Sequence, residues 1–304
     1  MRRRHPAPPP PDPRIRERLD DLAVLAGQAR AQQVAMRGVT DLREAEFRVF
    51  SQFGDDGIVE YLVGRIGVPR GAERFVEIGV EDYREANTRF LLVNRNWSGL
   101  IVDDGDAHVR AVSASPLMWR HDIRPVSAFV DRDNVNDLLR EHGFDRDLGL
   151  LSIDVDGNDY WIWEAVTAKP LVAVVEYNSV FGAERAVTVP YDAAFDRTRA
   201  HHSNLYFGAS LAALARLGER KGYRLVGSNS AGNNAYFVRA ELAEGLPAPT
   251  VVEAYVESRY RESRDEQGAL TFLAGAERAR AIADLEVWDL EREALVSVGD
   301  AAGA

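Results

Sequence analysis

Apolar runs of strand length alternate with segments of helical spacing through the middle of the chain. The two most apolar runs are Leu148–Asp156 and Leu171–Asn178, and both are expected to be strands buried on both faces of a sheet. Strands that alternate with helices in this way are usually parallel and are joined by right-handed crossovers. The pattern therefore predicts an α/β domain.

Further strands and helices extend this alternation in both directions. The other strands are expected at two places within Arg74–Asp104 and at Leu117–Asp122, Tyr223–Ser228 and Asn234–Arg239. Helices are expected at Ile15–Met36, Ser51–Gly67, Asp131–Gly143, Asp159–Ala168 and Ser210–Gly222. Because a tight turn joins the last two strands, one strand has to run antiparallel to the others. The predicted sheet is seven-stranded and mostly parallel, with helices on both faces.

The chain is expected to divide into four parts, which differ in composition and periodicity. They are a proline-rich disordered tail at 1–13, a helical segment at 14–50, the α/β domain at 51–246, and a helical, acidic appendage at 247–304. The appendage offers Trp288, Leu290 and Leu295 as docking points. A homodimer or a partner protein would bind through the terminal helices.

Composition excludes several classes of function. The chain has 304 residues, 46% of them hydrophobic, and a net charge of −11, so nucleic acid and anionic membranes are poor partners. The basic N-terminus lacks the apolar stretch of a secretory signal, and no run is long and apolar enough to span a membrane. Without cysteine there is no disulfide, thiolate zinc site or cysteine nucleophile. A cytoplasmic protein that acts on a small molecule fits this composition.

The first candidate site lies in Arg74–Asp104. The first strand of this stretch ends in Glu77 and Gly79, and the second ends in Asp103 and Asp104. A glycine lets backbone approach a ligand, and a carboxylate at the next strand tip can accept the hydroxyl protons of a ribose. The pattern favours a nucleoside-containing cofactor. The alternative is that it marks an ordinary strand–helix unit of the core.

A second acidic group follows the two most apolar strands. Asp154 and Asp156 share a face because they are two residues apart on a strand, as are Glu176 and Asn178. Neighbouring strand tips bring such oxygen ligands together, and Mg²⁺ or another hard divalent cation prefers them. A metal there would lower the pKa of a bound hydroxyl. The alternative is a turn in which Gly157 supplies a positive φ.

His201 and His202 are the best candidates for a general base, because histidine titrates near neutral pH. They lie in the long segment Ser179–Leu205, which has little regular pattern and suits a lid over a site. The alternative is a pair of solvated loop histidines. An acid such as Asp154 is then the catalytic base.

The order of elements resembles the class I S-adenosylmethionine-dependent methyltransferases, in particular the FkbM-like and macrocin O-methyltransferase-like groups. The resemblance spans about Ser51–Arg239 and rests on the stretches SQFGDDGI, VEIGVEDYREANTRFL with WSGLIVDD, SIDVDGNDYWIW, VVEYN and KGYRLVGSNSAGNNAYFVR. It implies a Rossmann-like class I methyltransferase sheet and S-adenosylmethionine as cofactor. It also implies a hydroxyl of a sugar or natural product as acceptor, and acids at the two strand ends that hold magnesium.

The resemblance also implies which residues meet the cofactor. They are Glu77 and Gly79 at the methionine end, Asp103 or Asp104 at the ribose, Asp122 at the adenine, Asn87 and Thr88 in the first loop, and Gln52 from the preceding segment. The family's loop has two further glycines after the first. This chain departs from the pattern, because Glu81 and Tyr83 occupy those positions.

Three functions compete on these grounds. The first is methyl transfer from S-adenosylmethionine to a hydroxyl. The second keeps the scaffold but promotes another displacement, such as an intramolecular ring closure in natural-product biosynthesis. The third is a non-catalytic partner subunit. Binding of S-adenosylhomocysteine separates the first from the second, and loss of activity on substituting the acids excludes the third.

Overall fold

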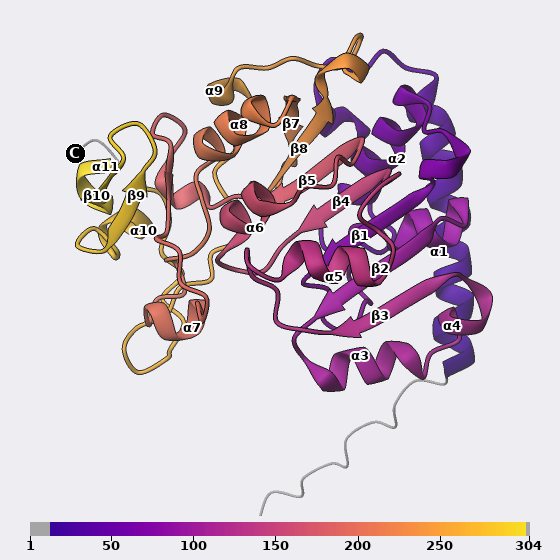
Figure 1. The fold of residues 1–304 in the computed structure, drawn as a ribbon, viewed down its shortest axis with the longest axis horizontal. Coiled ribbons are helices and arrows are strands. Elements are labelled where there is room, and N and C mark those ends of the chain that lie inside the picture. Colours follow the sequence, from indigo (N-terminus) through magenta and orange to yellow (C-terminus); the bar gives the residue numbers. More distant parts are fainter. Residues whose placement is uncertain (1–12, 302–304) are drawn as a thin grey trace, which may run out of the picture.

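The sheet of the computed structural model, which describes residues 13–301, confirms the predicted α/β architecture (Figure 1). Its strand order is β3-β2-β1-β4-β5-β8-β7, and every neighbouring pair is parallel except those that β8 makes with β5 and β7. The strands are β1 Arg74–Ile78, β2 Ser98–Asp103, β3 Ile123–Ser127, β4 Leu150–Ile153, β5 Val172–Glu176, β7 Tyr223–Ser228 and β8 Asn234–Arg239. The predicted hairpin thus supplies the antiparallel strand.

Helices of very different lengths surround this sheet. The α-helices are α1 Pro13–Ala35, α2 Asp55–Ile66, α3 Asp106–Ser113, α4 Leu117–Arg120, α5 Val135–Glu141, α6 Asp159–Ala165, α7 Arg197–Ala200, α8 Leu211–Arg220, α9 Val251–Ala254, α10 Ala276–Arg280 and α11 Val298–Ala301. Short 3₁₀ turns are η1 Leu42–Ala45, η2 Arg70–Ala72, η4 Ser179–Phe181 and η5 Ala240–Leu242, and η3 Leu91–Arg95 is a π-helix. The tail predicted at 1–13 lies outside the described residues, except for Pro13.

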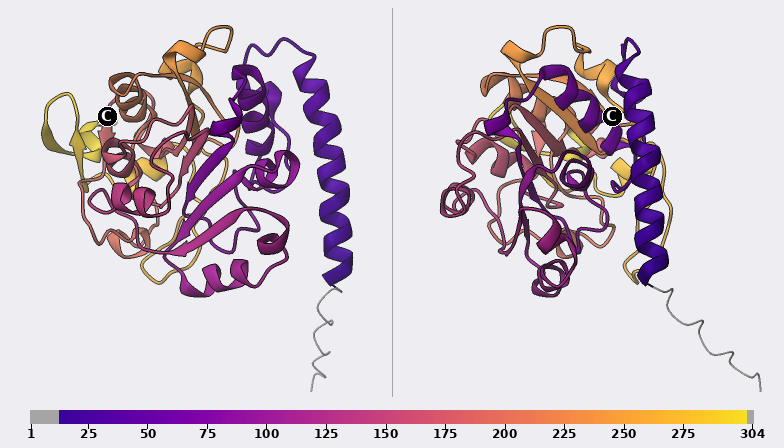
Figure 2. Two further views of the ribbon diagram at one scale, coloured as in Figure 1. Left: turned by 45° about the vertical axis from the view of Figure 1, so that its right-hand side comes forward. Right: turned by 90° about the vertical axis from the view of Figure 1, so that its right-hand side faces the viewer.

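The core consists of two apolar layers, one on each face of the sheet. Alternate residues of β5 enter different layers: Ala173 and Val175 pack with α5, α6 and α8, whereas Val172 and Val174 pack with α2, η1 and η3. The long helix α1 lies outside α2 and forms one side of the molecule (Figure 2). No helix between Pro13 and Ala301 combines the length and apolar character needed to cross a bilayer.

The prediction of a strand at Leu117–Asp122 is wrong. Residues 117–120 form the single-turn helix α4, and strand β3 begins only at Ile123. Pro116 adopts φ −60° and ψ −16°, which starts a helical turn in place of a strand. Asp122 therefore lies at the amino end of β3, where its carbonyl accepts a hydrogen bond from Gly99 N at the start of β2. This is the edge opposite the predicted cofactor site, so the adenine role of Asp122 is also wrong.

The C-terminal segment differs from the predicted helical appendage. It contains short helices and a β-hairpin, β9 Glu286–Asp289 with β10 Ala294–Ser297. Strand β9 also pairs with β6, Val187–Thr188, inside the long segment expected to be irregular. A separate small core seals this three-stranded sheet, and it includes Val187, Leu205, Ile282 and Val287. The C-terminal segment is therefore anchored onto the region that precedes α8.

Candidate active site

Five parallel strands end at one edge of the sheet, and four of them define the candidate site. β1 ends at Ile78, β2 at Asp103, β4 at Ile153 and β5 at Glu176. Open α/β sheets bind ligands at this carboxyl edge, because the loops that follow the strands leave a crevice there. The predicted residues can be placed relative to this edge.

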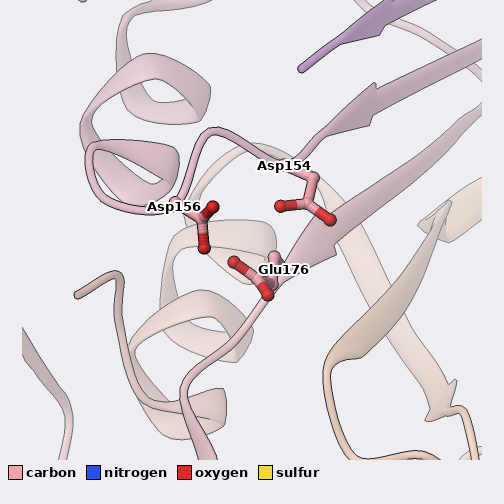
Figure 3. A group of neighbouring side chains, drawn as sticks. All are labelled: Asp154, Asp156 and Glu176. Atoms are coloured by element: carbon pink, nitrogen blue, oxygen red, sulfur yellow. The ribbon is translucent and has the colours of Figure 1, made fainter. Parts of the chain in front are cut away.

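An acidic cluster of Asp154, Asp156 and Glu176 lies at the ends of β4 and β5. One carboxylate oxygen from each residue lies within 4.8 Å of the other two, and the side chains point toward one another (Figure 3). Oxygens on opposite sides of a bound cation are about 4.2 Å apart for Mg²⁺ and about 4.6–5.2 Å apart for Ca²⁺. The structure thus brings together three of the four predicted metal ligands at a suitable spacing.

The cluster has an excess of negative charge that the described residues do not balance. Glu176 is 4% exposed, and its Oε2 has no hydrogen-bond partner within residues 13–301. Burial and then the charge of Asp154 raise the pKa of Glu176, and burial and then the charge of Asp156 raise the pKa of Asp154. Arg197 offsets this charge through an ion pair with Asp156. A divalent cation fits the remaining imbalance and the unpaired oxygen.

The turn that follows β4 is held by another carboxylate, Asp159. Its Oδ1 accepts a hydrogen bond from Val155 N at 2.8 Å, and its Oδ2 accepts one from Gly157 N at 2.9 Å. Asp156 sits within this turn at φ +53°. A turn therefore does follow β4, but its positive φ is at Asp156 and not at Gly157 as the turn interpretation expected. Asp154 and Asp156 present their carboxylates to the cluster.

Asn178, the fourth predicted ligand, ties loops together. Its Oδ1 accepts a hydrogen bond from Val180 N at 3.0 Å and so caps η4. Its Nδ2 donates to the carbonyls of Leu205 and Phe207, at 2.9 and 3.0 Å. Because its amide is engaged at both ends, the geometry gives Asn178 a positioning role beside the cluster.

At the first candidate site, the carboxylate of Glu77 contacts Asn87 and Thr88. Glu77 is 3% exposed, and its carboxylate accepts hydrogen bonds from Asn87 N at 2.8 Å, Thr88 N at 3.0 Å and the Thr88 hydroxyl. Burial raises the pKa of Glu77 to about 7. These bonds fix the start of the helical turn before η3, so they use most of the acceptor capacity of Glu77.

The loop after β1 has positive φ angles at the three positions where the expected pattern has glycine, although only the first of them is glycine. Gly79 has φ +81°, and a Cβ on it would lie 1.6 Å from the carbonyl oxygen of Asp154. Glu81 and Tyr83, which occupy the places of the other two glycines, have φ +45° and +58°. The buried Tyr83 hydroxyl lies 2.9 Å from Thr88 Oγ1, which helps to hold this conformation. The loop is therefore held with left-handed backbone at all three positions, and its role in cofactor binding stays a prediction.

Asp103 secures this loop with both of its oxygens. Its Oδ2 accepts hydrogen bonds from Val80 N at 3.1 Å and Glu81 N at 2.7 Å. Its Oδ1 accepts one from Gly105 N at 2.9 Å and lies 3.0 Å from a ring nitrogen of His108. A ribose would have to share these oxygens.

The other two predicted cofactor residues, Asp104 and Gln52, are exposed. Asp104 directly follows the tip of β2, so it lies at the carboxyl edge with its carboxylate in solvent. Gln52 precedes α2, next to Phe53, whose ring stacks on Tyr260 at a centroid distance of 5.5 Å. Asp104 is therefore the second carboxylate that a ribose can reach.

The two histidines contact each other and not the acidic cluster. The rings of His201 and His202 are 4.1 Å apart, and His201 Nδ1 lies 2.8 Å from Ser203 Oγ. Partial burial and then His202 lower the pKa of His201. Within residues 13–301, no hydrogen bond or ion pair joins either histidine to Asp154, Asp156 or Glu176. Their catalytic role stays a prediction.

Two residues near the cluster were not predicted, namely Arg197 and Tyr260. Arg197 also donates from Nε to the Asn204 carbonyl at 2.8 Å, and its guanidinium lies 4.0 Å from the centre of the Phe207 ring. Burial and then the charges of Glu176 and Asp154 raise the pKa of Tyr260. Tyr260 comes from the C-terminal segment, and no local pattern signals its approach to β5.

The strand order, with a single antiparallel strand next to the edge, defines a class I methyltransferase-like α/β fold. Neither a protein-family model nor a curated protein matches the chain.

Three solved structures show how distant the similarity is. An S-adenosylmethionine-dependent methyltransferase from Clostridium acetobutylicum ATCC 824 is 15% identical with a TM-score of 0.31, over 45% of this chain and 56% of its own. The N-terminal domain of EvdMO1 with SAH bound is 12% identical with a TM-score of 0.40, over 73% and 94%. The mitomycin 7-O-methyltransferase MmcR is 16% identical with a TM-score of 0.34, over 76% and 59%. With identities and TM-scores this low, these three similarities support no conclusion beyond the strand order described above.

Proposed function

We propose that the protein is an S-adenosylmethionine-dependent methyltransferase that acts on a hydroxyl of a small molecule, such as a sugar or natural product, with a divalent cation at its active site. The observation that carries the proposal is the unbalanced cluster of Asp154, Asp156 and Glu176 at the carboxyl edge of this sheet. The narrower resemblance to the FkbM-like and macrocin groups is part of the proposal and is supported by the sequence stretches alone.

Asp154, Asp156 and Glu176 would hold the cation, magnesium in this proposal, which when bound would supply Lewis acidity toward a hydroxyl oxygen. Asp154 is also the base that takes the hydroxyl proton in this proposal, because it lies at the tip of β4 beside the cation site. The left-handed loop from Gly79 to Tyr83 would hold S-adenosylmethionine, which supplies the electrophilic methyl group.

One observation favours a second candidate. Both carboxylate oxygens of Asp103 already accept hydrogen bonds, from the loop after β1 and from Gly105 N. Fewer lone pairs are therefore left to accept hydrogen bonds from the hydroxyls of a ribose. An enzyme that uses the same acidic cluster without the methyl donor, for instance in an intramolecular ring closure, is compatible with that arrangement. In this case too, Asp154 is the base.

Calorimetric titration of the full chain with S-adenosylhomocysteine, with and without MgCl₂, tests the two candidates. We expect micromolar S-adenosylhomocysteine binding and a separate Mg²⁺ binding event, and only the latter should be lost in Asp154→Asn. Mg²⁺ binding without S-adenosylhomocysteine binding would reject the methyltransferase and leave the second candidate. If neither ligand binds, both candidates fail.

A further inference from the structure

A buried arginine on α10 has no partner in the described part of the chain. Arg278 is 5% exposed, and its Nε is fully buried without a hydrogen bond. None of the ion pairs or side-chain hydrogen bonds within residues 13–301 involves Arg278, whereas Arg280 on the same helix is exposed. Burying an unpaired guanidinium costs stability, so an arginine in this state is suited to a partner from outside the chain.

Arg278 belongs to the region that adjoins the acidic cluster. Helix α10 packs against η4, and η4 begins at Ser179, three residues after Glu176. The strap, Tyr255–Tyr260, packs on the same turn. Tyr255 donates its hydroxyl hydrogen to the Ser179 carbonyl at 2.7 Å, and Ser258 N donates to Ser179 Oγ at 2.9 Å. The helix and the strap thus converge on the segment that leaves the tip of β5.

Arg278 is influenced by one negative and one positive side chain, Glu257 and Arg197. Burial lowers the pKa of Arg278, the exposed Glu257 raises it, and the positive charge of Arg197 lowers it. Arg197 is the same residue that pairs with Asp156 in the cluster. The positive charge of Arg197 thus acts both on the cluster, through Asp156, and on Arg278. A ligand with metal-binding oxygens at one end and an oxyanion at the other matches this distribution.

We propose that Arg278 binds an oxyanion of the substrate, a carboxylate or a phosphate, with Arg197 as the neighbouring cation. The substrate class is then a hydroxylated acid or a phosphorylated polyol. The identity of the reacting hydroxyl rests on the proposed function, whereas the oxyanion site depends only on Arg278 and its surroundings.

Titration of the full-length protein with inorganic phosphate and, separately, with acetate tests this site. We expect the wild type to bind at least one of them, Arg278→Met to bind it at least tenfold more weakly, and Arg280→Met to bind it as the wild type does. Without ligand, Arg278→Met should melt at a higher temperature than the wild type, because it removes an unpaired buried charge.

Three outcomes would overturn the proposal. The first is equal oxyanion affinity in Arg278→Met and the wild type. The second is a lower melting temperature of Arg278→Met, which would assign the arginine a structural role. The third is an equal loss in Arg278→Met and Arg280→Met, which would indicate an adventitious ion only. Wild-type oxyanion binding without S-adenosylhomocysteine binding would reject the methyltransferase and keep this site.

An independent observation concerns α1, which exposes a continuous stripe at alternating steps of four and three residues. The stripe consists of Ile15, Leu19, Leu22, Ala26, Ala29, Gln33 and Met36, all of them exposed. Leu19 and Leu22 are 60% and 62% exposed. The opposite face of the helix, with Gly27 and Val34, is buried against the domain. Figure 2 shows that α1 itself lies at the edge of the molecule.

The apolar surface continues onto α4. Arg120 of α4 bonds to Glu17 of α1, and the neighbouring Trp119 is 75% exposed. More than half of the large apolar side chains that are exposed in the described part of the chain lie on α1, at Met36 or on α4. A concentration of this kind is typical of an interface, and tryptophan is enriched among the residues that dominate binding.

We infer that α1 pairs with α1 of a second copy of this chain. A four–three repeat on one helix matches the same repeat on another helix, because the side chains interlock as knobs into holes. Ala26 and Ala29 at the middle of the stripe allow the two helices to approach closely. The occupant is therefore a second copy.

Light scattering on the purified full chain measures this association. We expect a mass of twice 33.7 kDa for the wild type, and the monomer mass for Leu22→Glu. Leu270→Glu, at an exposed leucine far along the chain, should remain dimeric. A monomeric wild type at tens of micromolar, or a dimeric Leu22→Glu variant, would refute the inference.

Discussion

Replacing Glu176 by glutamine is expected to abolish divalent-metal binding and to make the metal-free protein more stable at pH 8. The substitution keeps the size of the side chain and removes the charge of Glu176. This residue is only 4% exposed and lies beside Asp154. A buried charged group without a partner costs about 1–3 kcal/mol or more, so its removal should raise the free energy of unfolding by about that amount. The metal loses a charged ligand at the same time.

The pH dependence follows from the direction of the pKa shifts. Burial raises the pKa values of Glu176 and Asp154, and it raises that of Glu77 to about 7 and those of Asp56 and Asp159 to about 6. Unfolded carboxylates titrate at about 4, so the folded state holds these protons more tightly. The resulting stability is fully present below the unfolded pKa and is lost as the pH rises through the folded values. Metal-free wild type should therefore become less stable between pH 5 and 8.

Urea unfolding at pH 5, 6, 7 and 8, first with EDTA and then with MgCl₂, measures both effects. The gain from Glu176→Gln should shrink toward pH 5, where the wild-type carboxyl is protonated. Glu184→Gln, at an exposed glutamate, should behave as the wild type does. Wild-type Mg²⁺ affinity in Glu176→Gln, or a stability below that of the wild type at pH 8, would contradict the metal site.

Replacing Gly79 by alanine should be the most destabilising single change at the sheet edge. The new Cβ would lie 1.6 Å from the Asp154 carbonyl oxygen, and φ is +81°. Because the clash is with backbone, the tips of β1 and β4 have to separate. We expect a loss of about 3–5 kcal/mol and weaker metal binding, since Asp154 moves with its carbonyl.

Glu81→Gly, in the same loop, is the matched change, and it should raise the free energy of unfolding where Gly79→Ala lowers it. Glu81 has φ +45°, a conformation that costs a non-glycine residue about 1–2 kcal/mol. Glycine removes that strain but adds freedom to the unfolded chain, so the net gain should be at most about 1 kcal/mol. Urea unfolding of both variants decides the point. A Gly79→Ala variant as stable as the wild type would show that β1 and β4 are not held in this contact.

The positions of Asp154 and Glu176 could be predicted from the strand order, whereas that of Asp156 depends on the left-handed turn after β4. Asp154 follows one buried strand and Glu176 ends the next, and neighbouring parallel strands end at the same edge. Only the backbone period and the strand order are needed for that inference. The same logic failed for Asp122, because an apolar stretch after Pro116 formed a helical turn and β3 began later.

The roles of Asp103 and Arg278 could not be predicted, for two different reasons. Asp103 lies where expected, but the loop after β1 turns back and uses its oxygens, which depends on a left-handed Glu81 that no propensity favours. Arg278 reaches the region of the cluster through packing between segments about a hundred residues apart. Neither periodicity nor spacing records such a contact.

The positive φ angles at Gly79, Glu81 and Tyr83 also change what the glycine pattern of this loop means. The loop is defined here by its positive φ angles, and hydrogen bonds from Val80 N and Glu81 N to Asp103 stabilise it where glycine is absent. A search for glycines would pass over this chain, whereas a search for three alternate left-handed residues after a strand would find it. Left-handed backbone at alternate positions after a strand is thus reached in this chain with glycine at only one of the three positions.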